Sequence, residues 1–280
     1  MSSDSRKPFA PSHFFTVCLT TFLIVFAVFF FYPFIFVIVN SFKPDSEIIL
    51  NPIGFPKNFT FENYGKAWSE MNFPVAFLKT LFITVFGLLG IILTSSLAAY
   101  RLARTDNKIS WILYGFFAFA LVIPFQIIMV PIAVLSKNLN LMSVPGIVPM
   151  YWGLGCPTAI FMFHGFVKSV PKELEESASI DGAGEWYIFF NIVIPLLKTI
   201  IATIAVIDAL WLWNDFLLPF IVIQEGTIQL AQMKFSGGQT LARYGPLTAS
   251  LTLSSLPIIA FYLALQKYII KGIAAGAVKG

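Results

Sequence analysis

Two carboxylates, Asp208 and Asp215, interrupt the otherwise apolar residues 199–223. They are seven residues apart, so on a continuous helix they share one face, with Trp211 between them and close to that face. An ionisable side chain inside a segment of membrane-spanning length is a functional candidate by default. Carboxylates accept hydrogen bonds from neighbouring sugar hydroxyls, and an indole can stack on the C–H face of a sugar ring. The pattern therefore suits a pathway for a carbohydrate.

A structural interpretation of the same residues stays open. Asp208 can pair with another chain, and the residues around Asp215 can hold a helix distortion ahead of Pro219. Gln126 lies between two prolines, so it can line the pathway or bond to backbone groups that the prolines leave free. The candidate pathway residues are Asp208, Trp211, Asn214, Asp215 and Gln126.

Other reactive groups lack the spacing that catalysis or metal binding needs. His13 and His164 have no Cys, carboxylate or second His at ligand spacing, and Cys18 and Cys156 form no CxxC pair. The sequence contains no GxxxxGK[ST] loop for nucleotide phosphates and no nucleophile–base motif. We therefore expect no catalytic residue, no metal site and no cofactor bound by this chain, which argues against a membrane enzyme.

The composition is that of a membrane protein. Of the 280 residues, 58% are hydrophobic and 11% are charged, whereas a soluble domain has about a quarter charged. A helix needs about 20 apolar residues to cross the hydrocarbon core. The sequence predicts an all-α membrane protein with six transmembrane helices. The segments long enough to cross are 14–39, 80–100, 109–135, 147–167, 199–223 and 246–265. The lipid bilayer is thus an expected partner, and no basic cluster on a soluble domain points to nucleic acid.

The basic residues predict the orientation. With a cytoplasmic N-terminus, 11 of the 18 Lys and Arg fall in inside segments and 7 in outside segments. We therefore expect a multi-pass protein of a prokaryotic cell membrane with both termini in the cytoplasm. The predicted parts are a cytoplasmic N-terminus 1–13, a first transmembrane helix 14–39, an extracytoplasmic loop 40–72, a membrane core 73–271 and a cytoplasmic tail 272–280. A second outside loop is expected over 224–245.

Residues 171–197 form an acidic segment between the fourth and fifth spans, which places it in the cytoplasm. Pro171 and three acids in the next five residues favour the first turn of a helix. Gly182 can adopt positive φ and end that helix, and Asp181 can cap a second helix that restarts at about Gly184. The segment is therefore predicted to be a helix–turn–helix. The alternative is an ordinary amphipathic loop that its acids keep solvated.

The spacing within this segment resembles the "EAA" loop of ABC-importer permeases. That pattern is EAA, three residues, G, nine residues and I-x-L-P, and the chain has Glu176-Ser177-Ala178, Gly182 and Ile192-x-Ile194-Pro195 at the same spacing. It departs from the pattern only at Ser177 and Ile194. The stretches "SFKPDSEI", "WNDFLLPFIV" and "QKYIIKGIAAGAVKG" also look like those of the maltose-type sugar permeases.

The resemblance is to the shorter, six-helix permease of a carbohydrate importer, and it implies a type I ABC-importer fold. It implies a heterodimer with a second permease, two cytoplasmic ATP-binding subunits that carry ATP and Mg, and an extracytoplasmic sugar-binding protein. Residues 171–197 would be the coupling helix–turn–helix, with Trp186 and Phe189 anchoring its second helix to the permease core. The implied ATPase-coupling residues are Glu175, Glu176, Ala178, Asp181, Gly182 and Ala183.

Two further contacts follow from the resemblance. The tip of the second outside loop, Gly237, Gly238 and Gln239, would meet the sugar-binding protein, and a plain connector is the alternative. The small, flexible residues 272–280 would reach the ATP-binding subunits, or would simply be a frayed terminus. A different class of function is a secondary transporter or channel that works without an ATPase. Asp208 and Asp215 could supply its coupling, but that function leaves the acidic helix–turn–helix unexplained.

Overall fold

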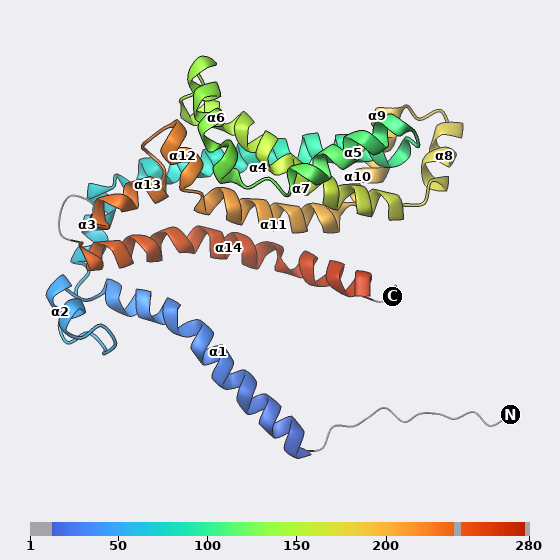
Figure 1. The fold of residues 1–280 in the computed structure, drawn as a ribbon. Coiled ribbons are helices and arrows are strands. Elements are labelled where there is room, and N and C mark those ends of the chain that lie inside the picture. Colours follow the sequence, from blue (N-terminus) through green and yellow to red (C-terminus); the bar gives the residue numbers. More distant parts are fainter. Residues whose placement is uncertain (1–12, 238–241, 278–280) are drawn as a thin grey trace.

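The structure is a computed structural model that describes residues 13–237 and 242–277, and over these ranges it consists of helices joined by turns and short loops, without a strand (Figure 1). The all-α prediction is confirmed. The elements are α1 (His13–Ser41), α2 (Asp45–Leu50), α3 (Glu62–Glu70), α4 (Phe73–Arg104), α5 (Lys108–Ala120), α6 (Phe125–Asn138), α7 (Val144–Ser169), α8 (Glu173–Ile180), α9 (Glu185–Ile188), the π-helix η1 (Phe189–Val193), α10 (Ile194–Leu196), α11 (Lys198–Asn214), α12 (Leu217–Val222), α13 (Ile228–Gln232), the 3₁₀-helix η2 (Met233–Phe235) and α14 (Tyr244–Ala277).

Four of the described helices, α1, α4, α7 and α14, are long and apolar enough to cross a membrane. Two more spans are possible if each of two bent helix pairs counts as one. The pair α5 and α6 bends by 102°, and the helix Glu185–Leu196 meets α11 at 75°. The sequence-based count of six spans therefore holds only when both bent pairs are included.

Two predicted spans are interrupted rather than continuous. The segment 109–135 divides into α5 and α6, because Pro124 stands in extended conformation (φ −63°, ψ 138°) and has no N–H to continue the helix. Pro131, by contrast, lies inside α6 without ending it. The segment 199–223 stops at Asn214 and resumes at α12, so its helix is shorter than predicted.

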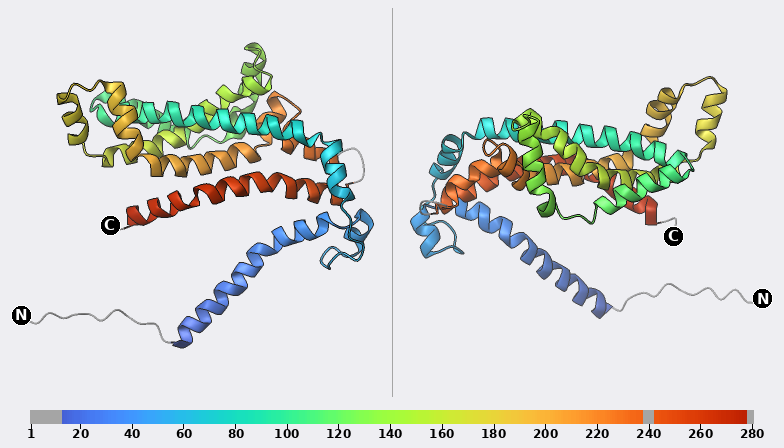
Figure 2. Two further views of the ribbon diagram at one scale, coloured as in Figure 1. Left: turned by 180° about the vertical axis from the view of Figure 1, so that it is seen from behind. Right: turned by 45° about the horizontal axis from the view of Figure 1, so that its top comes forward.

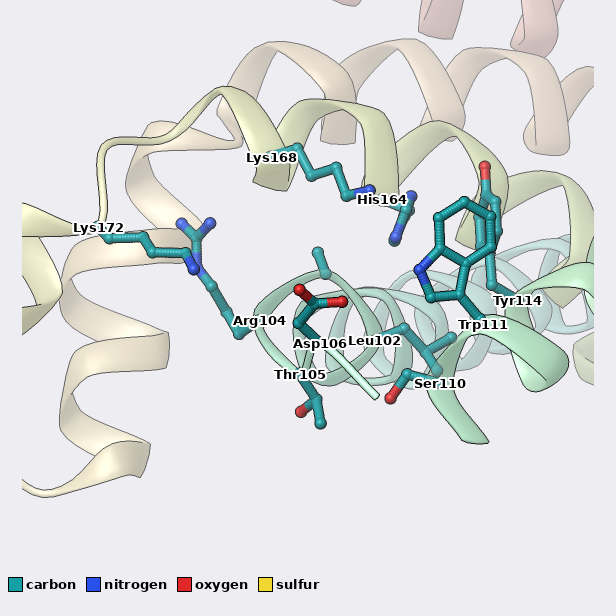
Figure 3. Close-up of a pocket in the computed structure, with 11 residues that line it drawn as sticks. Leu102, Arg104, Thr105, Asp106, Ser110, Trp111, Tyr114, His164, Lys168 and Lys172 are labelled. Carbon is teal, nitrogen blue, oxygen red and sulfur yellow. The ribbon is translucent and has the colours of Figure 1, made fainter. Parts of the chain in front are cut away.

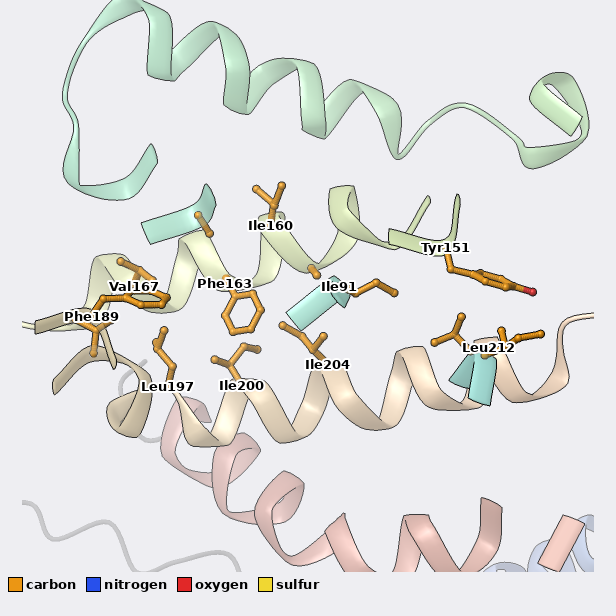
Figure 4. Close-up of a cluster of buried hydrophobic side chains, with 14 of the residues drawn as sticks. Ile91, Tyr151, Ile160, Phe163, Val167, Phe189, Leu197, Ile200, Ile204 and Leu212 are labelled. Atoms are coloured by element: carbon orange, nitrogen blue, oxygen red, sulfur yellow. The ribbon is translucent and has the colours of Figure 1, made fainter. Parts of the chain in front are cut away.

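The core forms where α4, α7 and α11 pack along one another (Figure 4). Apolar side chains from all three helices meet there, among them Ile91, Phe163 and Ile204. Gly90 lets α4 and α7 approach closely, since the Trp152 indole lies where a Gly90 side chain would be and its Nε1 donates to the Phe86 carbonyl at 3.0 Å. Small residues at such contacts are the usual means by which membrane helices pack.

The two ends of the bundle carry different structures (Figures 1 and 2). One end holds α8, α9 and the C-terminal end of α14, and the other holds α2, α3 and α13, while α1 slants away from the bundle. Residues 272–277 are helical rather than a flexible tail, because α14 continues to Ala277.

The loops predicted on the other side form one folded cap, made of α2, α3, α13 and η2. The Arg243 guanidinium donates to both carboxylate oxygens of Glu70, at 2.6 and 2.9 Å, which holds the pKa of the Glu70 carboxyl below its usual range. Lys234 Nζ donates to the Glu70 carbonyl at 3.0 Å, and Phe235 is fully buried. The stretch 224–237 is therefore docked on the first loop rather than free.

Replacing Gly90 by Ala tests the close approach of α4 and α7. The added methyl group would collide with Trp152 Nε1, so the indole must move and lose its bond to the Phe86 carbonyl. We expect a loss of about 1–3 kcal/mol in unfolding free energy, as for other overpacked cores. Denaturation in sodium dodecyl sulfate measures it. Gly115→Ala is the matched control, because nothing lies within 4 Å of the added atom. Equal stability of the two variants would contradict the packing argument.

Candidate functional site

The acidic segment folds into the predicted helix–turn–helix. Helix α8 ends where Gly182 takes φ +86°, and the Ala183 N–H donates to the Ala178 carbonyl at 2.9 Å to close the turn. The prediction for Asp181 is wrong, since Asp181 ends α8 while Gly184 precedes α9 without a side-chain cap. The Asp181 carboxylate is exposed instead.

Glu175 fastens α8 to the end of α4. Arg104 donates to Glu175 Oε1 from Nε at 2.9 Å and from Nη2 at 2.6 Å, and the Tyr100 hydroxyl donates to Oε2 at 2.8 Å. Arg104 Nη2 also donates to the Val170 carbonyl at 2.9 Å, where α7 ends. Both charged side chains are only 12% exposed. The Glu175 carboxylate is thus occupied within the chain, although the resemblance assigned it to a partner.

The remaining residues of the segment divide into an inner and an outer face. Ala178, Ala183 and the buried Phe189 pack against the core of α4, α7 and α11. The outer side, here called the docking face, consists of the exposed residues Glu176, Ile180, Asp181 and Trp186. Trp186 is 67% exposed, so the expectation that it anchors the second helix is wrong, and the buried Phe189 and Ile188 have that role. An exposed apolar and acidic surface of this kind is suited to a protein partner.

A cavity of about 430 Å³ lies farther along the bundle, beside the breaks in two spans. Its wall is formed by the link between α5 and α6, the start of α6, the middle of α7 and the end of α11 with the start of α12. It brings together Gln126, Trp211 and Asp215, which are three of the five predicted pathway residues. Thr158 adds a hydroxyl. The cavity thus offers an amide, a carboxylate, a hydroxyl and an indole in an apolar wall, a set that can bind a polyhydroxylated solute.

Asp208 and Asp215 do not share a helix face. Helix α11 ends at Asn214, and Asp215 leaves it in extended conformation (φ −70°, ψ 129°), so the seven-residue spacing no longer sets a common direction. Asp208 is buried at 5% exposure, and its Oδ2 has no hydrogen-bond partner in the described part of the chain. The Asn214 amide donates to the Leu210 carbonyl at 2.8 Å and does not line the cavity.

Asp215 also has a structural role. Its Oδ2 accepts the hydroxyl of the buried Tyr151 at 2.8 Å, and its Oδ1 accepts the Leu217 N–H at 3.1 Å. The carboxylate therefore holds the break between α11 and α12, as the structural interpretation predicted. Sequence analysis missed Tyr151 and Thr158. A tyrosine hydroxyl in an apolar span, which needs a buried partner, was the signal for the first.

The proposed contact loop is described only in part. Gly237 takes φ +89° directly after η2, while Gly238 and Gln239 lie outside the described residues. Because Ile228, Ala231 and Phe235 are buried in a cluster with residues of α3 and α4, the start of this stretch is held in place. In the described ranges no three His, Cys, Asp or Glu side chains come together as metal ligands would.

Comparisons with known proteins agree on one family. The family described as "Binding-protein-dependent transport system inner membrane component" matches residues 90–275. The chain is 39% identical over 264 residues to the "Probable starch degradation products transport system permease protein AmyC" of Thermoanaerobacterium thermosulfurigenes, covering 93% of this chain and 96% of that one. It is 34% identical to the "Melibiose/raffinose/stachyose import permease protein MelC" of Bacillus subtilis, covering 89% and 92%.

A solved structure gives the same fold. The chain superposes with a TM-score of 0.82 on a chain from the crystal structure of a bacterial ABC transporter involved in the import of the acidic polysaccharide alginate. The match covers 94% of this chain and 99% of that one at 22% identity. Together with the family match and the identity to its relatives, this makes the chain a multi-pass membrane protein that belongs to the family of binding-protein-dependent transport system inner membrane components.

Proposed function

We propose that the chain is a permease subunit of an ATP-driven sugar importer and forms half of the translocation pathway beside a second permease. The observation that carries this proposal is the acidic helix–turn–helix, which is fixed to α4 by Glu175 and presents a separate docking face. Two of the relatives are named for starch degradation products and for melibiose, raffinose and stachyose. The substrate class is accordingly a sugar.

The docking face meets the ATP-binding subunits, which hold ATP and Mg. Glu176 and Asp181 supply its negative charge, and Ile180, at 86% exposure, supplies apolar area. When those subunits close, α8 moves, and the Glu175–Arg104 ion pair carries the movement to α4. Because α4 packs along α7 and α11, the helices that border the cavity move with it. This is alternating access by rigid-body motion.

The cavity beside Trp211 is this chain's share of the sugar pathway. Gln126, Thr158 and Asp215 offer hydrogen-bond partners to sugar hydroxyls, and the Trp211 indole, 37% exposed, offers a stacking surface. The cap faces the outside and receives the sugar-binding protein near Gly237. The docking face and both termini lie in the cytoplasm, as the excess of basic residues on that side favours.

Glu175→Gln tests the ion pair as the mechanical link. It removes the charge that matches Arg104 and leaves that largely buried guanidinium without its carboxylate, so α8 loses its fixed position. In the assembled importer in vesicles we expect sugar uptake to fall about tenfold, while ATP hydrolysis falls much less. Glu173→Gln on the exposed side of α8 is the control and retains uptake. A parallel loss of hydrolysis and uptake in the Glu175 variant would mean that it acts on assembly.

The docking face is tested by Glu176→Lys combined with Gly182→Pro. The first change reverses the charge, and proline cannot adopt the φ of +86° that the turn requires. We expect the ATP-binding subunits to be lost from the purified complex and uptake to disappear. Glu225→Lys, the same charge reversal at the cap, retains those subunits. Unchanged uptake in the double variant would contradict the assignment of this face as the contact with the ATP-binding subunits. Transport by the chain alone would support a secondary transporter.

Trp211→Ala tests the cavity. It removes the stacking surface but leaves the Asp215 bonds that hold the break before α12. We expect the sugar concentration for half-maximal uptake to rise about tenfold with little change in ATP hydrolysis. Trp68→Ala on α3, an exposed indole at the cap, is the control for loss of a tryptophan. If the two variants transport alike, the sugar does not contact Trp211.

A further inference from the structure

A second cavity lies at the end of the bundle that carries α8. It occupies about 340 Å³ between the last turn of α4, the start of α5 and the last turns of α7 (Figure 3). Its wall includes Lys168, Lys172, Asp106, Trp111 and His164. No step of the proposed transport mechanism uses this cavity.

The charges around the cavity are predominantly positive. Lys168 and Lys172 border it from the end of α7 and the start of the acidic segment, both are exposed, and neither is in an ion pair among the described residues. Arg104 also borders it, but Glu175 matches the charge of Arg104. Asp106 places one carboxylate at the opposite wall (Figure 3). The cavity therefore suits an anion that also carries hydrogen-bond donors.

The surroundings of the cavity suit a lipid rather than a soluble anion. Trp111 is 69% exposed, and Lys168 Nζ lies 6.0 Å from the centre of its ring. From Trp111 an exposed apolar face continues along α5 through Ile112, Phe116 and Phe119. Tryptophan and lysine are the residues that sit at headgroup level, with apolar residues deeper in the bilayer. A molecule with a charged head and long apolar chains matches both regions at once.

We propose that this cavity binds the headgroup of an anionic phospholipid whose headgroup also carries hydroxyls, as phosphatidylglycerol does. The phosphate lies between Lys168 and Lys172, a headgroup hydroxyl donates to Asp106, and the acyl chains follow the exposed face of α5. Basic pockets between membrane helices on the cytoplasmic side are suited to such headgroups. The inference needs the chain to span a membrane, but it does not depend on which solute is transported.

The site adjoins the coupling segment. Lys172 directly precedes α8, and Arg104 borders the cavity while holding Glu175. A bound headgroup therefore touches the residues that fix α8 to α4. Anionic lipid thus stabilises the position of the docking face.

Native mass spectrometry of the purified full chain in detergent tests the site, with equimolar phosphatidylglycerol and phosphatidylcholine as probes. We expect the chain to retain phosphatidylglycerol preferentially. Each ammonium near an anionic surface contributes about fivefold in affinity, so Lys168→Gln with Lys172→Gln should lower the preference at least tenfold. The control, Lys108→Gln with Lys198→Gln, removes the same charge at the same end from residues outside the cavity wall. Equal preferences in the two double variants would overturn the proposal.

Two further measurements separate the possible ligands. Soluble glycerol 3-phosphate in excess should leave the lipid bound, and its displacement of the lipid would assign the cavity to a free phosphate ester instead. Phosphatidylethanolamine retained as well as phosphatidylglycerol would overturn the anionic assignment.

If the double variant fails to fold, the wild-type chain still gives an answer. Brominated phosphatidylglycerol should quench the tryptophan fluorescence of the wild-type chain more than brominated phosphatidylcholine does. In the Trp111→Phe variant this difference between the two lipids should disappear. Equal quenching by the two lipids contradicts the site.

Discussion

The absence of water from the bilayer core is the constraint on which the rest of this structure depends. Every backbone N–H and C=O there needs a partner, so helices are the rule, and irregular backbone is tolerated only where protein satisfies it or a cavity borders it. The chain breaks its helices between α5 and α6 and between α11 and α12, and the same cavity lies against both breaks. At the second break Asp215 accepts the Leu217 N–H, and the Gln229 amide donates to the Trp213 carbonyl. The two helix breaks, which would be costly in contact with lipid, thus form the polar wall of this cavity.

Helix α4 contacts three regions of the chain: the cap, the core with α7 and α11, and the acidic helix–turn–helix. At the cap, its Thr80 hydroxyl accepts the Ile228 N–H at 3.0 Å, which holds α13 in place. In the middle, Gly87 and Gly90 bring α7 and α11 close, since side chains of both helices lie against these glycines. At the other end, Arg104 binds Glu175. In the proposed mechanism this continuous helix of 32 residues links a displacement of α8 to the cavity and the cap.

Local features of the fold were predictable from sequence, and long-range pairings were not. The apolar runs predicted the helices and Gly182 predicted the turn after α8, because both features depend only on residues that are neighbours in sequence. The bend between α5 and α6 was signalled by Pro124, but its angle of 102° depends on long-range packing, since α5 packs on α7 while α6 packs on α12. Arg104 and Glu175 are 71 residues apart, and Arg243 and Glu70 are 173 apart, so no spacing rule connects them. The prediction that Asp208 and Asp215 share a helix face was wrong because it assumed a continuous helix.

The adjacent acids Glu175 and Glu176 show how a pairing within the chain alters a surface. Successive residues of a helix point about 100° apart, so one acid faces α4 while the next faces away. Because Glu175 neutralises Arg104, that guanidinium adds no net charge beneath α8 and does not offset the negative charge of Glu176 and Asp181. Without Glu175 the same two acids would lie over an uncompensated guanidinium, and a basic partner would meet a weaker field. The internal ion pair therefore fixes the position of the docking face and removes one positive charge that would oppose its two acids.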